Sequence, residues 1–67
     1  MKLTEEQFDQ LIDEVFTVGV HINDAIDFLK EKVPEDNEAT NFIKRLKKID
    51  FLIAQIDNEL EDLKRNP

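Results

Sequence analysis

The chain has 67 residues, with 16 acidic and nine basic side chains and a net charge of −7. It has no cysteine and one histidine, which excludes a disulfide framework, a thiolate metal site and a multi-histidine metal cluster. The length fits one domain over residues 1–67. A core of that size is only marginally stable on its own, so a partner chain would be physically useful.

The acidic balance also argues against nucleic-acid backbones as ligands, because binding them requires lysine and arginine to neutralise phosphates. No run of about 18 apolar residues is present, so no membrane span is expected. No basic region followed by an apolar block opens the chain. We therefore expect no secretory signal, and a cytoplasmic location is the default.

The first predicted element is a helix over about residues 5–33. Thr4 is a good N-cap, and Gln7 three residues later completes a capping box. Pro34 ends the helix, because proline disfavours helical geometry in the residue before it. Steps of four and three, typical of one buried helix face, separate Phe8, Ile12, Val15, Gly19, Ile22, Ile26, Leu29 and Val33.

Gly19 leaves two alternatives open for this helix. It stands among residues that form helices poorly, so the helix could break near residues 17–19 and restart at Asn23. The unbroken spacing favours one continuous helix.

A short loop at residues 34–37 separates this helix from a second one over about residues 37–65. Asp36 or Asn37 can cap the second helix, and Lys64 and Arg65 complement the dipole at its end. The predicted buried face of each helix is called its seam. The seam of the second helix again follows steps of three and four, through Ala39, Phe42, Leu46, Ile49, Ile53, Ile56, Leu60 and Leu63.

The short loop predicts an all-α antiparallel two-helix hairpin. In such a hairpin the residue numbers of two opposed residues add to a nearly constant value. Seven seam pairs add to 71 or 72, for example Gly19 with Ile53. Charges support the same pairing. The basic cluster at residues 44–48 would face Asp24 and Asp27, and the end of the second helix would approach the glutamates at residues 5–6.

Further apolar residues flank the seam, namely Leu11, Val18 and Ala25 on the first helix and Ile43 and Leu52 on the second. A face this wide is typical of a globular bundle, whereas a two-stranded coil needs only a narrow stripe. We therefore expect a homodimer that forms a four-helix bundle through these five residues. The architecture resembles, in shape alone, the small dimeric hairpins of the plasmid RNA-binding Rop type.

No residue pattern predicts catalysis, a cofactor or a metal. His21 falls on a mid-helix face with no nucleophile to activate, and the many carboxylates fit a solvated face. The spaced acidic loop of a calcium site and the Glu-x-x-His motifs of a di-metal bundle are both absent. The sequence therefore predicts a protein that is not an enzyme.

Candidate partner-binding residues are Phe28 and Phe51, which point away from the seam, and Lys44 and Lys48 near Phe51. The first hypothesis is a protein–protein interaction module, acting as an adaptor, regulator or inhibitor. The alternative is an acidic nucleic-acid mimic, since residues 1–40 alone carry a net charge of −8. A weaker alternative is direct RNA binding by the basic cluster, with Phe51 as a stacking platform.

Overall fold

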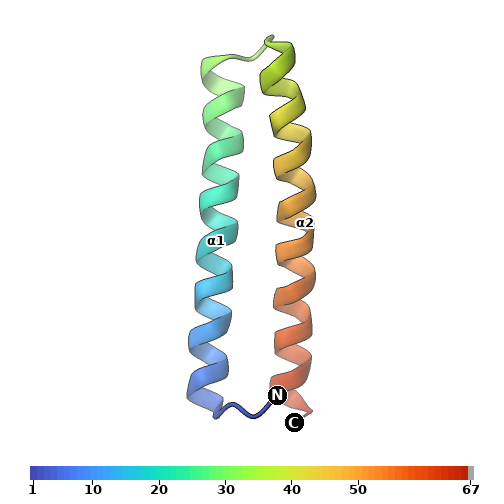
Figure 1. Cartoon of the computed structure of the whole chain (residues 1–67). Coiled ribbons are helices and arrows are strands. Elements are labelled where there is room, and N and C mark those ends of the chain that lie inside the picture. The colour runs from blue at the N-terminus through green and yellow to red at the C-terminus, as the bar shows by residue number, and fades with distance from the viewer. Residues whose placement is uncertain (67) are drawn as a thin grey trace.

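The computed structural model describes residues 1–66, which form two long helices joined by a short loop (Figure 1). Helix α1 spans Glu5–Lys32 and helix α2 spans Asn37–Arg65. The loop lies at one end and both ends of the chain lie at the other, so the helices are antiparallel. The predicted all-α hairpin is confirmed. Pro67, the last residue of the predicted domain, lies outside the described residues.

Side-chain caps fix where the helices begin. The Thr4 hydroxyl accepts a hydrogen bond from the backbone N–H of Gln7, and the Gln7 side chain accepts one from the N–H of Thr4. This reciprocal pair is the predicted capping box. At the start of α2, a carboxylate oxygen of Asp36 accepts a 2.9 Å hydrogen bond from the backbone N–H of Ala39. Both caps satisfy amide groups that a helix N-terminus leaves unpaired.

Helix α1 is continuous through Gly19, which decides between the two alternatives. No glycine or other residue within positions 1–66 has a positive φ. Gly19 lies against α2, where an added Cβ would stand 3.4 Å from Cγ2 of Ile53. An added methyl group would therefore come close to ordinary contact with Ile53, and the backbone needs no special conformation.

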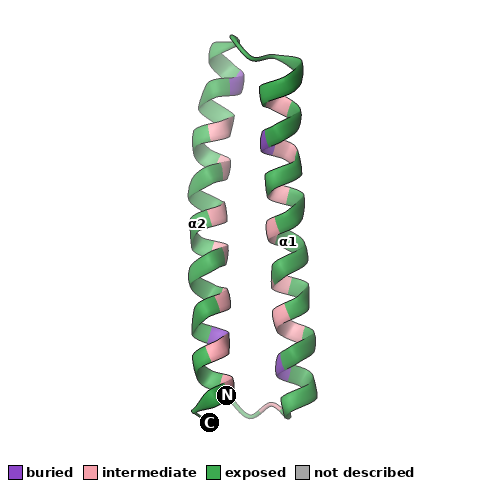
Figure 2. Cartoon of the chain, turned by 180° about the vertical axis from the view of Figure 1, so that it is seen from behind, coloured by how far each residue is buried: buried purple, intermediate pink, exposed green. Residues whose placement is uncertain are grey.

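The two helices contact each other along one edge each, where Figure 2 shows the buried and half-buried positions. On α1 this edge follows the predicted seam from Phe8 to Leu29, while Val33 is exposed. On α2 the edge differs from the prediction. It consists of Ala39, Ile43, Leu46, Asp50, Ile53, Asp57, Leu60 and Lys64, which are buried or half-buried, and Glu61 beside them is also half-buried.

The difference is a rotation of α2 about its own axis. The predicted and observed edges share Ala39, Leu46, Ile53 and Leu60. They differ in the neighbouring column, where residues 43, 50, 57 and 64 replace residues 42, 49, 56 and 63. Because a helix turns by about 100° per residue, this exchange corresponds to a rotation of about 50°. Four large apolar residues thereby stay on the surface.

Neither helix of the described part is long and apolar enough to cross a membrane.

Candidate interaction surface

One side of the hairpin carries a row of exposed and half-buried apolar side chains, which we call the apolar stripe. It consists of Leu11, Val18 and Ala25 on α1 and Phe42, Ile49, Ile56 and Leu63 on α2. Within each helix the members are seven residues apart, so they stack along one line. Leu11 and Ala25 are half-buried, whereas Val18 and the four α2 residues are 41–48% exposed.

The two halves of the stripe belong to the same side of the hairpin. A groove on the other side is lined by Phe16 and Asn23 from α1 and by Ala54 from α2. On α1, Phe16 and Asn23 each come one position after a seam residue. The stripe residues of α1 each come one position before a seam residue, so they lie at the other edge of the seam. The same relation holds on α2, where Ala54 follows seam residue Ile53. The stripe and the groove therefore lie on opposite sides.

Two further apolar residues widen the stripe at its outer edges. Phe28 on α1 is 59% exposed and Leu52 on α2 is 55% exposed. The Arg45 guanidinium stands 5.8 Å from the centre of the Phe42 ring, a cation–π geometry that covers part of the ring. The apolar face thus runs from Leu11 to Phe28 on α1 and from Phe42 to Leu63 on α2.

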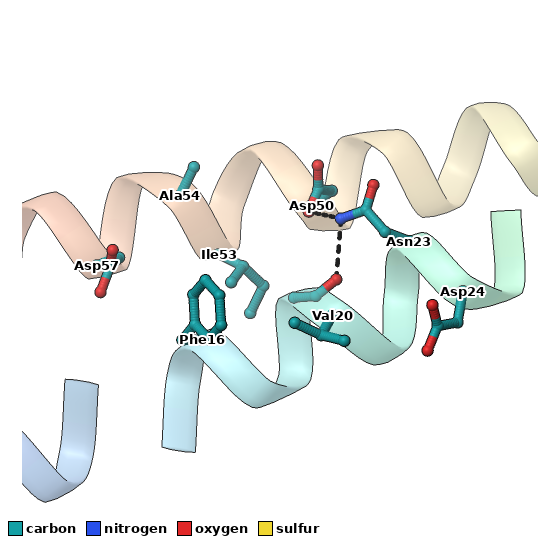
Figure 3. A pocket seen from close by; sticks show the side chains of 9 residues that line it. Phe16, Val20, Asn23, Asp24, Asp50, Ile53, Ala54 and Asp57 are labelled. Carbon is teal, nitrogen blue, oxygen red and sulfur yellow. Dashed lines mark hydrogen bonds between the residues drawn. The ribbon is translucent and has the colours of Figure 1, made fainter. Parts of the chain in front are cut away.

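The groove on the opposite side has a volume of about 330 Å³ and combines apolar walls with carboxylates (Figure 3). Phe16, Val20 and Ile53 supply apolar surface. Asn23 Nδ2 donates hydrogen bonds to the backbone oxygen of Gly19 at 2.9 Å and to Oδ1 of Asp50 at 3.0 Å. The second bond joins the helices and gives half-buried Asp50 a partner.

Asp57 also lines this groove, but its polar atoms are less well satisfied. Its Oδ1 atom is buried and receives no hydrogen bond from residues 1–66. A buried acceptor without a partner costs roughly 1–3 kcal/mol. The seam of α2 therefore contains a carboxylate oxygen that gains no hydrogen bond from the hairpin.

A lysine on α2 connects the two helices at the end where the chain begins and ends. Lys64 donates a hydrogen bond to Asp9 of α1 within an ion pair. This bond, and then the negative charges of Asp9, Glu5 and Glu61, raise the pKa of Lys64 above 10.5. Arg65 instead pairs with Asp62 of its own helix at 3.0 Å.

The ion pairs predicted between the two helices are therefore only partly formed. The lysine partner is Asp9, one turn beyond the predicted glutamates at residues 5–6. No ion pair in the described part of the chain joins the basic cluster at residues 44–48 to Asp24 or Asp27. In the same part, no three acidic or histidine side chains are arranged to hold a metal ion.

The residues predicted to bind a partner do not form one site. Phe28, Phe51, Lys44 and Lys48 are all exposed. Phe51 and Lys48 line a shallow hollow on the outer surface of α2, together with Lys47 and Leu52, whereas Phe28 lies on α1 and does not line it. Exposed Phe51 is thus an anchor candidate separate from the stripe.

The residues predicted for a dimer interface fall into two groups. Leu11, Val18 and Ala25 form the α1 half of the stripe, and Leu52 lies beside its α2 half. Ile43 is half-buried on the edge of α2 that faces α1. His21 is exposed, on the outer edge of the stripe.

Comparison with protein-family models, curated proteins and solved structures found no match.

Sequence reasoning missed the α2 half of the stripe because it assigned those four residues to the seam. The column of Phe42 is wholly apolar, whereas the column of Ile43 contains Asp50, Asp57 and Lys64. Apolar content alone therefore favours the wrong column. One signal pointed the other way, since Asn23 flanks the α1 seam and can bond a carboxylate such as Asp50.

Proposed function

We propose that this chain is a non-catalytic protein–protein interaction module, an adaptor, regulator or inhibitor, that packs a protein partner onto the apolar stripe. The observation that carries this proposal is the stripe itself, seven apolar residues in register along both helices. Contiguous exposed apolar surface of this kind marks interaction sites in soluble proteins. Phe42 and Phe28 supply aromatic side chains, which are enriched at interface anchors.

The test is affinity capture from native lysate with three tagged proteins. The stripe variant carries Ile49→Glu and Ile56→Glu. The control carries Gln55→Glu and Asn58→Glu, which add the same charge to exposed positions of the same helix. We expect the wild type and the control to retain the same proteins, and the stripe variant to lose them. Equal retention by all three proteins would contradict the proposal, and circular dichroism checks that each remains helical.

One observation favours a second candidate function, a nucleic-acid mimic that blocks a basic groove. Exposed carboxylates run along the outward face of α1, at Glu6, Asp13, Asp24, Asp27 and Glu31. Binding of such a mimic would weaken steeply between about 50 and 200 mM salt, as phosphate contacts do. Capture through the stripe would instead persist at the higher salt, because apolar contacts are not screened.

The RNA-binding alternative makes a separate prediction, because it depends on Lys44, Lys48 and Phe51 on the outer surface of α2. A gel shift at low salt with structured RNA tests it directly. Absence of a shift at micromolar protein would remove that alternative and leave the stripe proposal unaffected.

A further inference from the structure

We propose that the partner on the apolar stripe is a second copy of this chain, with each helix antiparallel to its own copy. This inference deepens the proposed function and rests on it, since it uses the same surface. It specifies the two-fold axis, the residue pairs that meet and the charges that select this arrangement.

A single hairpin exposes more surface than a compact chain of the same mass. Its accessible surface is 5500 Å², whereas a compact monomer of 7.9 kDa is expected to expose about 4400 Å². The excess of about 1100 Å² is comparable to the roughly 800 Å² that each partner loses in a standard interface. The broad side of the hairpin extends 46 Å by 15 Å between Cα atoms, about 700 Å². One such side is therefore large enough for a stable dimer.

Each half of the stripe also complements itself when its direction is reversed. On α1, Val18 would meet Val18 of the second copy, and Leu11 would meet Ala25. On α2, Phe42 would meet Leu63 and Ile49 would meet Ile56. A two-fold axis requires such a self-complementary patch. Apolar side chains then face apolar side chains over residues 11–25 of α1 and residues 42–63 of α2.

The centres of the two halves lie at nearly the same height, as one axis requires. The α1 half is centred on Val18 and the α2 half between Ile49 and Ile56. Gly19 contacts Ile53 across the hairpin, so Val18 is level with about residue 54. The two centres therefore differ by about two residues, or about 3 Å along the axis. This offset is smaller than one helical turn of about 5.4 Å, so the same side chains stay opposed.

Charges at the outer edge distinguish this arrangement from the other symmetric one, in which α1 covers α2 of the second copy. That alternative also matches apolar residues, for example Val18 with Ile56, but it places exposed Glu14 opposite exposed Glu59. The self-paired arrangement instead places Arg45 opposite Glu59, and it places His21 in place of a second carboxylate opposite Glu14. Charge pairs at flanking positions select helix partners, and like charges disfavour them. The charges therefore favour each helix lying against its own copy.

In this bundle the groove lined by Phe16, Val20 and Asn23 faces outward, because it lies on the side opposite the stripe. Exposed Phe51 also stays at the surface. The dimer thus leaves two copies of these features free for a further protein.

Sedimentation equilibrium of the purified full chain tests the proposal. We expect about 16 kDa at micromolar concentration, twice the 7.9 kDa chain mass. Arg45→Glu should weaken the dimer by about tenfold, equivalent to about 1.4 kcal/mol, and adding Glu59→Arg should restore it. Arg45 and Glu59 are four turns apart on one helix, so only contact between copies explains this rescue. Both are exposed, so the hairpin should fold in each variant.

Oxidative crosslinking provides an independent readout, because the chain has no natural cysteine. Val18→Cys should form a disulfide-linked dimer, since residue 18 meets its own copy at the axis. The control, Thr17→Cys, faces solvent and should remain largely uncrosslinked.

Two outcomes would overturn the inference. A fully helical wild-type monomer at all concentrations would exclude the second copy, while stripe-dependent capture from lysate would still support the proposed function. A dimer that Glu59→Arg strengthens on its own, without rescuing Arg45→Glu, would overturn the self-paired arrangement.

Discussion

Replacing Asp57 by leucine should stabilise the protein, although aspartate is the native residue. The substitution removes a buried carboxylate oxygen that has no hydrogen-bond donor among residues 1–66. Relief of that unsatisfied acceptor is worth roughly 1–3 kcal/mol. The leucine side chain also gains partial burial against Phe16 and Ile53 in the groove, whose volume of about 330 Å³ leaves room for it. A fully buried leucine contributes roughly 1.5–3 kcal/mol, and half-burial about 1 kcal/mol.

Allowing for imperfect packing, we expect a gain of about 2 kcal/mol in the free energy of unfolding. For a domain of this size each kcal/mol raises Tm by about 4–8 °C, so Tm should rise by about 10 °C. Urea unfolding should show a higher midpoint at an unchanged m-value. Protein concentration must be held constant, because any self-association also shifts the midpoint.

The matched control is Asn58→Leu, which makes a similar change at the next position, where the side chain is exposed. It should change stability by less than about 0.5 kcal/mol. If Asp57→Leu is no more stable than Asn58→Leu, the assignment of Asp57 to the seam is refuted. A variant less stable than the wild type would instead show that Asp57 makes a favourable interaction that this hairpin does not contain.

Two further predictions concern Gly19 and Lys64. Gly19→Ala should raise Tm by about 4 °C, because alanine favours helix by about 1 kcal/mol and its Cβ would meet Ile53 Cγ2 at 3.4 Å, close to ordinary contact. A lowered Tm would mean that the added methyl group clashes with Ile53 and would contradict this prediction. The hydrogen bond to Asp9 raises the pKa of Lys64 above 10.5. The ion pair therefore stabilises the protein below that pH, and this stabilisation is lost as the pH rises through the folded-state pKa of Lys64. In chemical denaturation, the stability difference between wild type and Lys64→Met should therefore shrink above about pH 10.5, and a difference that stays constant to about pH 12 would contradict the ion pair.

The local features of the fold could be predicted because short-range chemistry decides them. Thr4 and Gln7 lie within one helical turn, so their capping box depends on no distant residue. Pro34 restricts the residue before it, so the end of α1 near Lys32 follows from the chain itself. The continuity of α1 through Gly19 was harder to predict, because a glycine in a helix costs only about 1 kcal/mol and neighbouring contacts can offset it.

The surface available to partners could not be predicted to the same degree. The helix α2 offers two possible edges that share Ala39, Leu46, Ile53 and Leu60. Counting apolar residues favours the edge that contains Phe42, whereas the hairpin uses the edge that contains Ile43. The bond from Asn23 to Asp50 belongs to the observed edge, and it joins residues 27 positions apart.

Caps, a proline and a seven-residue period act within a few turns of the chain, so the amino-acid sequence alone predicts two helices of these lengths that fold back on each other. Contacts between the helices select the face of α2 that turns inward, and they leave four large apolar residues exposed beside Leu11, Val18 and Ala25. Rotating a helix by about 50° about its own axis changes none of its backbone hydrogen bonds, so only contacts with the other helix can distinguish the two faces.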